Sequence, residues 1–500
     1  MDIELPAVGG QASRGQEPSS TAFISGHPIT SGDAHRNSIS GRFFRLSSSD
    51  VRALIIVVAS FTVVFTACGM TFVFGVYQDL YGSMSLQPDT PFTGASPATI
   101  DLIGTIAISL MTLGAPFATA WTKRFPPRRV IISGAVVFSL ANLLASYSQK
   151  LWQFELTQGL LLGIGTCLTY IPAVTVTPTW FDKRRGLAMG LVISGTGVGG
   201  VVFAPAMRAL NSSIGFRNTL RLSAGVSFVL LTLSGWAIDW DRTTGSVMQQ
   251  VLDAENTNRA RLTGTRHTGW RRQIRGLWHI PLVDWRIAHS RKFAAQALGA
   301  VLQAAAYYTP VFFFSSYART LGYSASTGAN FIALSNAMNA VGKIVIGYAA
   351  DRCGRVNTLF ATTFVSAVVC LGLWLPSTFD GDGGRDLFVA FVLFYGIFAS
   401  AYVSLFPTSL VEIFGVAHYA SVNGVLYMLR GLAALIGTPV AGALIRGRGG
   451  SVRAAGARSP TSYEHTSVMV GVLMALATIA VLWLRLEAAG TIGAVSKWRL

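Results

Sequence analysis

The sequence predicts an all-α membrane protein with twelve transmembrane helices in two six-helix pseudo-repeat bundles. Three observations support this fold class: an apolar composition, twelve long apolar blocks, and a weak repeat between the two halves of the chain. Of the 500 residues, 51% are hydrophobic and 12% are charged, whereas soluble globular chains average about 25% charged residues. The composition therefore argues against a large soluble enzyme.

Each apolar block is long enough to cross the hydrocarbon core of a bilayer as a helix, which takes about 20 residues. The first block is typical, because residues 53–77 contain no charged side chain. A polar interval after the sixth block predicts an N-terminal bundle over 51–238 and a C-terminal bundle over 294–487. The twelve blocks are 53–78, 99–121, 130–148, 152–178, 186–209, 217–238, 294–316, 325–350, 358–376, 387–411, 418–445 and 467–485.

Three polar segments flank or connect the bundles. Residues 1–50 are rich in Ser and Gly and lack a short apolar core with a cleavage site. They predict a disordered cytoplasmic tail and not a signal peptide. Residues 239–293 form a cytoplasmic linker, and residues 488–500 form a C-terminal cytoplasmic tail. The basic residues of the linker are Arg242, Arg259, Arg261, Arg266, Arg271, Arg272, Arg275, Arg286, Arg291 and Lys292.

Lys and Arg in the short loops indicate which helix ends face the cytoplasm. The loops after the second, fourth and eighth blocks are basic, whereas the loop after the first contains Asp79 and Asp89 and no Lys or Arg. Both termini are therefore expected in the cytoplasm. One loop disagrees, because it lies outside in this topology and yet holds Arg446, Arg448, Arg453 and Arg458. The sequon at Asn211 also lies outside, close to the bilayer, and is a candidate glycosylation site.

Motifs for other chemistry are missing from the sequence. The net charge of +17 is spread over short segments between apolar blocks, which is typical of loops that contact anionic lipid and not of nucleic-acid binding. The four Cys have no metal or disulfide spacing, and no catalytic grouping of carboxylates, Ser and His occurs. The glycine-rich stretch 195–200 lies within a span and does not follow a strand. We expect no enzyme activity, no cofactor and no metal.

The stretch "GYAADRCGR" (347–355) places a charged, glycine-containing turn directly after an apolar block. It fits the pattern Gly-x-x-x-Asp-Arg-x-Gly-Arg through Gly347, Asp351, Arg352, Gly354 and Arg355. With the six-plus-six arrangement, this resembles the loop motif of the major facilitator superfamily. The resemblance implies the major facilitator fold, with the substrate bound between two halves. Other stretches are similar to the fungal monocarboxylate-porter-like branch: 163–190, 195–200, 284–293 and 437–445.

We call these five motif residues the latch. Asp351 at a cytoplasmic helix end can accept hydrogen bonds from Arg groups and from backbone amides at the start of a neighbouring helix, which would hold the inner gate shut. In the first half, Lys123 and Pro126 stand where the motif has Asp and Gly. Only the second half therefore carries a complete latch. The alternative is that these charges merely mark a short cytoplasmic loop.

Ionised side chains within spans cost about 2.5–3.5 kcal/mol on insertion scales and are candidates for function. Arg430 lies in the middle of the eleventh block. It is expected to bind substrate or to gate, with a structural polar contact as the alternative. Asn423, Tyr427 and Arg430 share one helical stripe through spacings of four and three. Such a stripe suits a medium-sized organic anion or a flat heterocycle.

Lys343 and Asn339 lie one turn apart on one helix face. The resemblance places Lys343 where monocarboxylate porters have an Arg that pairs with the substrate carboxylate, and Asn339 where they have an Asp. Lys343 thus keeps the positive charge of that Arg, whereas Asn339 replaces the Asp that carries a proton in those porters. Lys343 therefore either binds substrate, or lies near the cytoplasmic end, snorkels and closes the gate. Further candidates for the cavity, or for helix bridging, are Gln303, Tyr307, Tyr308, Asn336 and Tyr402.

We expect a secondary transporter that moves a small organic molecule by alternating access. The substrate is an organic anion, a monocarboxylate-like compound or a secondary metabolite. Branch resemblance favours uptake, whereas loss of the proton-coupling positions is compatible with export of a fungal secondary metabolite. Coupling to protons and facilitated transport both remain open, and a non-transporting nutrient sensor is the alternative class. We expect a monomer in the lipid bilayer of the plasma membrane, or of a vacuole or other endomembrane, with no nucleic-acid partner.

Overall fold

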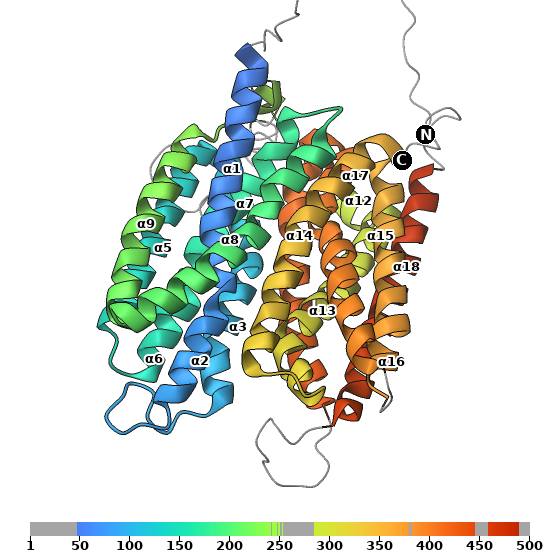
Figure 1. The fold of residues 1–500 in the computed structure, drawn as a ribbon. Helices are drawn as coiled ribbons and strands as arrows, with labels where there is room; N and C mark the ends of the chain where they lie inside the picture. Colours follow the sequence, from blue (N-terminus) through green and yellow to red (C-terminus); the bar gives the residue numbers. More distant parts are fainter. Residues whose placement is uncertain are drawn as a thin grey trace, which may run out of the picture. The chain divides into compact units, whose positions relative to one another are not determined.

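The structure is a computed structural model that describes residues 48–241, 243–247, 249–250, 253, 285–379, 383–445 and 459–489. These residues are helical almost throughout (Figure 1). Ten of their helices are long and apolar enough to cross a membrane, and one bent pair adds an eleventh span. Because the longest helix contains a break and supplies two spans, the described residues contain the expected twelve.

Six spans precede the predicted linker, and we call them the first group. Two of them are broken: Val73 (φ −82°, ψ 3°) separates α1 from α2, and α3 meets α4 at an angle of 43°. The first predicted block is thus two helices. The group contains α1 Ser48–Phe72, α2 Phe74–Met84, α3 Pro97–Leu113, α4 Ala115–Arg124, α5 Pro127–Tyr147, α6 Leu151–Phe154 with a π-helical segment Glu155–Leu161, α7 Leu162–Val176 with a 3-10 turn Thr177–Trp180, α8 Arg185–Ser213 and α9 Phe216–Ala237.

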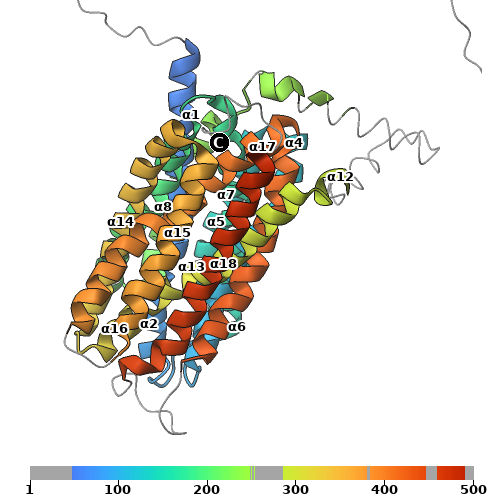
Figure 2. The same ribbon diagram turned by 90° about the vertical axis from the view of Figure 1, so that its right-hand side faces the viewer.

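The second group follows the predicted linker, whose last described helix is α12 Trp285–Ala288. Figure 2 shows this group facing the viewer. It contains α13 Arg291–Thr320, α14 Ala325–Cys353, α15 Arg355–Val369 with a π-helical segment Cys370–Trp374 and α16 Leu375–Ser377, α17 Gly384–Ala443, and α18 Glu464–Ala489 after a 3-10 turn Pro460–Tyr463. We call the end of the bundle at which α9 finishes and α13 begins the linker end; it is uppermost in Figures 1 and 2.

Helix α17 is 60 residues long, which at 1.5 Å per residue would be about 90 Å, three times the hydrocarbon core. It divides at Gly415, whose φ of 71° and ψ of 163° are non-helical. Glycine adopts positive φ without steric cost. The chain therefore turns back at the linker end, and the two parts of α17 form the tenth and eleventh predicted spans.

Glycines bring the two groups into backbone contact along α8 and α14. A Cβ added to Gly190 would lie 2.3 Å from the carbonyl oxygen of Lys343, and one added to Gly347 would lie 2.4 Å from that of Gly186. Within the first group, a Cβ added to Gly195 would lie 2.8 Å from the Phe61 carbonyl oxygen of α1, and one added to Gly199 would lie 2.5 Å from that of Phe65. Small residues permit such approach between membrane helices. Close packing between helices therefore accounts for these glycines of α8.

Several predicted features lie outside the described residues. These are most of the 1–50 tail, all but the first two residues of the 488–500 tail, and most of the linker, together with Arg446, Arg448, Arg453 and Arg458. Asn211 is described and lies in the last turn of α8, where both of its side-chain amide atoms are buried. Its glycosylation stays a prediction.

Replacing Gly190 by alanine tests the backbone contact between the groups. We expect Gly190→Ala to destabilise the protein by about 1–3 kcal/mol, because the methyl group meets backbone atoms that cannot move aside independently. The measurement is the thermal unfolding midpoint in detergent. The matched control is Gly225→Ala on α9, where a Cβ meets nothing within 4 Å. Equal midpoints for the two variants would contradict the proposed contact.

Candidate functional site

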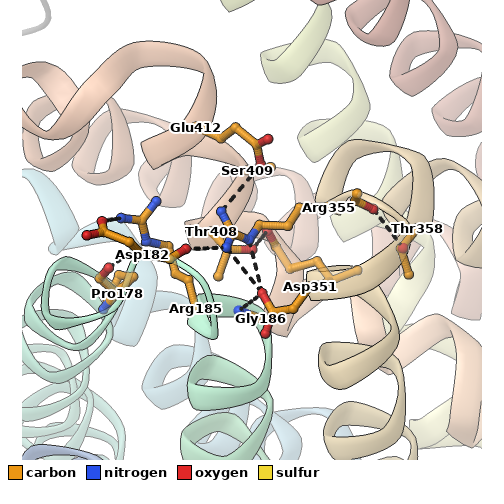
Figure 3. A network of polar contacts seen from close by, with 12 residues as sticks. Pro178, Asp182, Arg185, Gly186, Asp351, Arg355, Thr358, Thr408, Ser409 and Glu412 are labelled. Carbon is orange, nitrogen blue, oxygen red and sulfur yellow. Dashed lines mark hydrogen bonds and ion pairs between the residues drawn. The ribbon is translucent and has the colours of Figure 1, made fainter. Parts of the chain in front are cut away.

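Asp351, near the end of α14, binds the start of α8 in the other group (Figure 3). Its Oδ1 accepts a hydrogen bond of 2.8 Å from the Gly186 N–H, and its Oδ2 accepts one of 2.8 Å from the Leu187 N–H. The N-cap residue of α8 is Arg184, which supplies no side-chain cap. Asp351 thus serves as the cap from outside the helix, and the partial positive charge of the helix start stabilises its carboxylate. The structure contains the contact that the sequence predicted.

Arg355, at the start of α15, joins three further chain segments to Asp351 (Figure 3). Its Nε and Nη2 donate to Asp351 Oδ1 at 3.3 and 3.2 Å. Nη2 also donates to the carbonyl oxygen of Asp182 at 2.7 Å, and Nη1 lies 3.6 Å from Oε2 of Glu412 on α17. A guanidinium presents five N–H donors in one plane. One cation therefore links α14, α15, α17 and the segment before α8.

The segment before α8 is held in place by Arg185. Its Nε donates to the carbonyl oxygen of Pro178 at 2.7 Å, and its Nη2 to Asp182 Oδ1 at 3.2 Å (Figure 3). These bonds fix the segment that precedes α8 and thereby position the first turn of the helix, which carries the Gly186 and Leu187 amides. Arg185 belongs to the site, although the sequence indicated it only as one of the basic residues after the fourth block.

The remaining latch residues have different places. Gly354 has a φ of 95° and a ψ of 137° and allows the chain to turn from α14 into α15 without a loop. Gly347 permits the close approach to α8. Arg352 is exposed, with its guanidinium carbon 4.5 Å from the ring centre of Tyr348. The sequence motif thus places Gly347, Asp351 and Arg355 at the contact between the groups and Gly354 at the turn beside it.

A second set of contacts joins the groups where α17 restarts after Gly415. Lys123 Nζ on α4 donates a hydrogen bond to Ser421 Oγ. The Tyr419 hydroxyl donates to the carbonyl oxygen of Val174 at 3.1 Å, and Asn423 Nδ2 donates to Thr175 Oγ1 at 3.1 Å. Lys123, which stands in the first half where the motif has Asp, thus also connects the two groups. Asn423, a predicted substrate residue, bridges the groups here.

Arg430 lies on the second part of α17 and is 5% exposed. Its guanidinium carbon is 5.0 Å from the ring centre of Phe406 and 5.2 Å from that of Tyr402. Nη1 has no hydrogen-bond partner among the described residues, whose ion pairs do not include Arg430. A buried cation without a counterion is unfavourable. An anion bound beside Arg430 would remove that deficit.

Arg430 lines a cavity between the groups with a volume of about 20 Å³, which is room for about one water molecule. A drug-sized ligand needs roughly 300–1,000 Å³, so this conformation is closed to one. The walls from the first group are Ile108, Met111, Thr112 and Tyr170, and those from the second are Ala304, Tyr308, Val403, Tyr427, Arg430 and Ala434.

Another cavity of about 20 Å³ lies within the first group. It is lined by uncharged residues, among which are Thr71, Tyr77, Asn142 and Gln158. No wall of this cavity comes from the second group. The cavity at Arg430 is the stronger candidate for the substrate site, because it has a charged wall and lies between the two groups.

The structure brings three of the predicted cavity residues, Tyr308, Tyr427 and Arg430, to one cavity. Asn339 Nδ2 donates to the Tyr307 hydroxyl at 3.1 Å. Gln303 is 1% exposed, and neither of its amide atoms has a hydrogen-bond partner among the described residues. Asn336 lies against Gly197 and Gly200 of α8. These residues lie between helices and do not line the cavity.

Lys343 is 2% exposed and does not snorkel. Its Nζ donates to Thr196 Oγ1 at 2.8 Å and to the carbonyl oxygen of Ile193 at 3.3 Å. Both acceptors belong to α8, so Lys343 forms part of the contact between the groups. Of the two expectations for this residue, surface snorkelling is wrong in this conformation, because the whole side chain is enclosed between α8 and α14.

The sequence analysis missed the wall of the cavity that the first group contributes. Tyr170 donates or accepts a hydrogen bond of 3.3 Å with the hydroxyl of Tyr427 across the groups. Met111 and Thr112 belong to the same wall of the cavity and lie next to the bend between α3 and α4. Tyr170 could have been noticed in the sequence, because its hydroxyl is a polar group within an aliphatic block. Met111 is apolar like most of its neighbours, so nothing in the sequence distinguishes it.

Comparisons with known proteins agree with this architecture. Residues 59–384 and 297–499 match the family described as Major Facilitator Superfamily. The chain is 28% identical over 437 residues to the "Agnestins efflux protein AgnL12" of Paecilomyces divaricatus, covering 87% of this chain and 88% of the relative. It is 26% identical over 407 residues to the "Aspyridones efflux protein apdF" of Emericella nidulans, covering 80% and 73%.

Solved structures share the fold at low sequence identity. A double-tryptophan mutant of XylE superposes with a TM-score of 0.66 at 12% identity, covering 86% of this chain and 94% of that one. The human organic anion transporter MFSD10 (TETRAN) gives 0.55 at 13% identity, covering 86% and 100%. The latch, the two six-span groups and the family match lead to one conclusion. This chain belongs to the Major Facilitator Superfamily, whose members are transporters and not enzymes.

Proposed function

We propose that the chain exports an organic anion that binds at Arg430 between the two groups. The observation that carries this proposal is the buried guanidinium of Arg430, whose Nη1 has no partner among the described residues. A carboxylate can accept two parallel N–H bonds from such a group. The binding of an anion therefore satisfies a donor that the protein itself leaves free.

The surroundings of Arg430 favour a planar anion. The rings of Tyr402 and Phe406 lie beside the guanidinium, and Tyr170, Tyr308 and Tyr427 line the cavity. Aromatic faces stack on conjugated ligands, and hydroxyl groups supply hydrogen bonds at the edge. Acidic fungal secondary metabolites and aromatic monocarboxylates both fit this description.

Export is favoured over uptake by two arguments. Two relatives are named as efflux proteins, one for agnestins and one for aspyridones. An interior-negative potential of 100 mV also favours expulsion of a monovalent anion by about 2.3 kcal/mol, without any coupled ion. Uptake of a monocarboxylate is the second candidate. It has less support, because Lys343, the residue that suggested it, is bonded to α8 and does not line the cavity.

Transport by alternating access requires the contacts between the groups to break and re-form. The latch would close the linker end, and the small volume at Arg430 fits a conformation between loading and release. We propose that the linker end faces the cytoplasm, because its helix ends and loops carry Arg124, Arg128, Lys183 and Arg184. We further propose a monomer in the plasma membrane.

Replacing Arg430 tests the substrate site. The probe is a panel of radiolabelled aromatic carboxylates, with the matching carboxamides as uncharged controls, in vesicles that contain the purified protein. We expect transport of carboxylates and not of carboxamides. Arg430→Met should lower it roughly 10- to 100-fold, since a charge-assisted hydrogen bond contributes about 1.5–3 kcal/mol.

The control for this experiment is Arg208→Met, which removes an exposed arginine of α8. That variant should transport normally. Unchanged flux in Arg430→Met would remove Arg430 from the site. Saturable binding of a carboxylate without translocation would support the sensor alternative instead.

Replacing Asp351 tests the latch. Asp351→Asn removes the negative charge from the start of α8, so we expect the ratio of open to closed linker ends to rise roughly 10- to 100-fold. The measurement is the distance between spin labels on Lys183→Cys and the native Cys353. Both positions are exposed, whereas Cys68, Cys167 and Cys370 are buried.

Asp386→Asn is the matched control for the latch variant. Asp386 also lies in the first turn of a helix, α17, but is exposed and lies at the opposite end of the bundle. Its replacement should leave the distance distribution as in the unmodified protein. A latch variant with that same distribution would show that Asp351 does not control the linker end.

A further inference from the structure

Among the charges buried in the described part of the bundle, the two that lie deepest are both positive. The charged residues less than 9% exposed are Lys123, Arg185, Lys343 and Arg430, and the Asp351 side chain, paired with Arg355 at the linker end, is 8% exposed. Lys123 and Arg185 lie at the linker end, whereas Lys343 and Arg430 lie deeper in their helices. Arginine keeps its proton at all accessible pH values. Among these deeper charges, Lys343 alone can exchange a proton.

The partners of Lys343 match an uncharged amine. A neutral amine has two N–H bonds to donate, whereas an ammonium has three. Within the described residues, Lys343 Nζ has two acceptors, Thr196 Oγ1 at 2.8 Å and the Ile193 carbonyl oxygen at 3.3 Å. Both are neutral. They replace only part of the hydration shell that an ammonium loses when it is 2% exposed.

Lys343 lies on the contact that the latch closes. It precedes Gly347 by one turn and Asp351 by two on α14, and its own carbonyl oxygen is the atom that a Cβ on Gly190 would meet at 2.3 Å. Separation of α8 from α14 must therefore break both hydrogen bonds of Nζ and admit water. Lys343 therefore becomes hydrated whenever the linker end opens.

Other titratable groups near this contact could also respond to pH. Cys68 on α1 is buried, and its thiol donates to Met111 Sδ at 3.9 Å. Within the described residues, none of the other titratable or charged groups on α14, on α15 and on the elements packed against α14 forms a hydrogen bond or ion pair with Lys343. Among these groups are Asp351, Arg352, Arg355, Arg185 on α8, Tyr307 and Tyr308 on α13, and Tyr402, Glu412, His418 and Arg430 on α17.

We infer that Lys343 is the proton-binding group of this carrier, charged when the linker end is open and neutral when it is closed. On closure, Nζ passes one proton to water and keeps the electron pair, and the remaining two N–H bonds donate to Thr196 and Ile193. On opening, water returns the proton. This inference rests on the proposed transport function, to which it adds control of the linker end by pH.

The direction of the pH effect follows from hydration. An ammonium is stabilised by water in the open form, and a neutral amine costs little to bury in the closed form. Closure is therefore favoured at high pH and becomes less favourable as the pH falls and Lys343 binds a proton. The limit for one coupled proton is a tenfold change in the open-to-closed ratio per pH unit.

The test is the distance between spin labels on Lys183→Cys and Cys353, in the full-length protein in lipid nanodiscs and without substrate. We expect the open fraction to rise as the pH is lowered from about 9 to about 5.5, by up to tenfold per unit in the ratio. Lys343→Met should be closed and independent of pH. Lys343→Arg, with a permanent charge, should be more open and equally independent of pH.

Two controls separate Lys343 from its neighbours. His418→Gln and His289→Gln each remove an imidazole near the linker end, and both should keep the pH response. A flat response in the unmodified protein, or an undiminished response in Lys343→Met, would overturn the inference. Neither result would affect the carboxylate flux through Arg430, so failure here is distinguishable from failure of the transport proposal.

Discussion

The carboxylate of Asp351 at the start of α8 is the contact on which the linker end of this transporter depends. Helix α8 begins after two basic residues, Lys183 and Arg184, and has no side-chain cap of its own, so its first amides need an acceptor from elsewhere. Asp351 reaches them only because glycines on both helices let the backbones approach. Arg355 then holds the same carboxylate and ties in Asp182 and Glu412. Helix packing and electrostatics thus support one another at this point.

The interior has a different electrostatic character. Two cations lie deep in the second group, and each has a distinct chemistry. Arg430 is permanently charged and lies among aromatic rings, which suits an anionic ligand. Lys343 can become neutral and lies between backbone and hydroxyl acceptors, which suits a role tied to helix separation. The substrate and the gate are accordingly assigned to different charges, on different helices of the same group.

The twelve spans could be predicted from sequence, because an apolar block of sufficient length has few alternatives to a membrane helix. The latch could also be predicted, since its charges interrupt an apolar context. The breaks at Val73 and Gly114 could not, because local packing decides where an apolar helix bends. The connection after the tenth block was expected to be a loop, and the structure replaces it with the single residue Gly415.

The candidate site was predicted only on the side that carries charge. Arg430 stood out because a cation in an apolar block is unusual, and Tyr427 followed from its helical spacing. The opposite wall, with Met111 and Tyr170, depends on which helices of the first group face α17. Helical periodicity does not contain that information. For the same reason Asn423 was assigned to substrate, whereas it contacts Thr175.

The break at Gly415 has a mechanical consequence. Glu412, which contacts Arg355, precedes it by three residues, and Tyr419, which contacts Val174, follows it by four. A connection of one residue has no slack, so a displacement of one arm of α17 is passed to the other arm almost undiminished. The two parts of α17 therefore move together about the turn at Gly415. Lengthening that turn by even a few residues would uncouple the latch contact of Glu412 from the contact of Tyr419 with the first group.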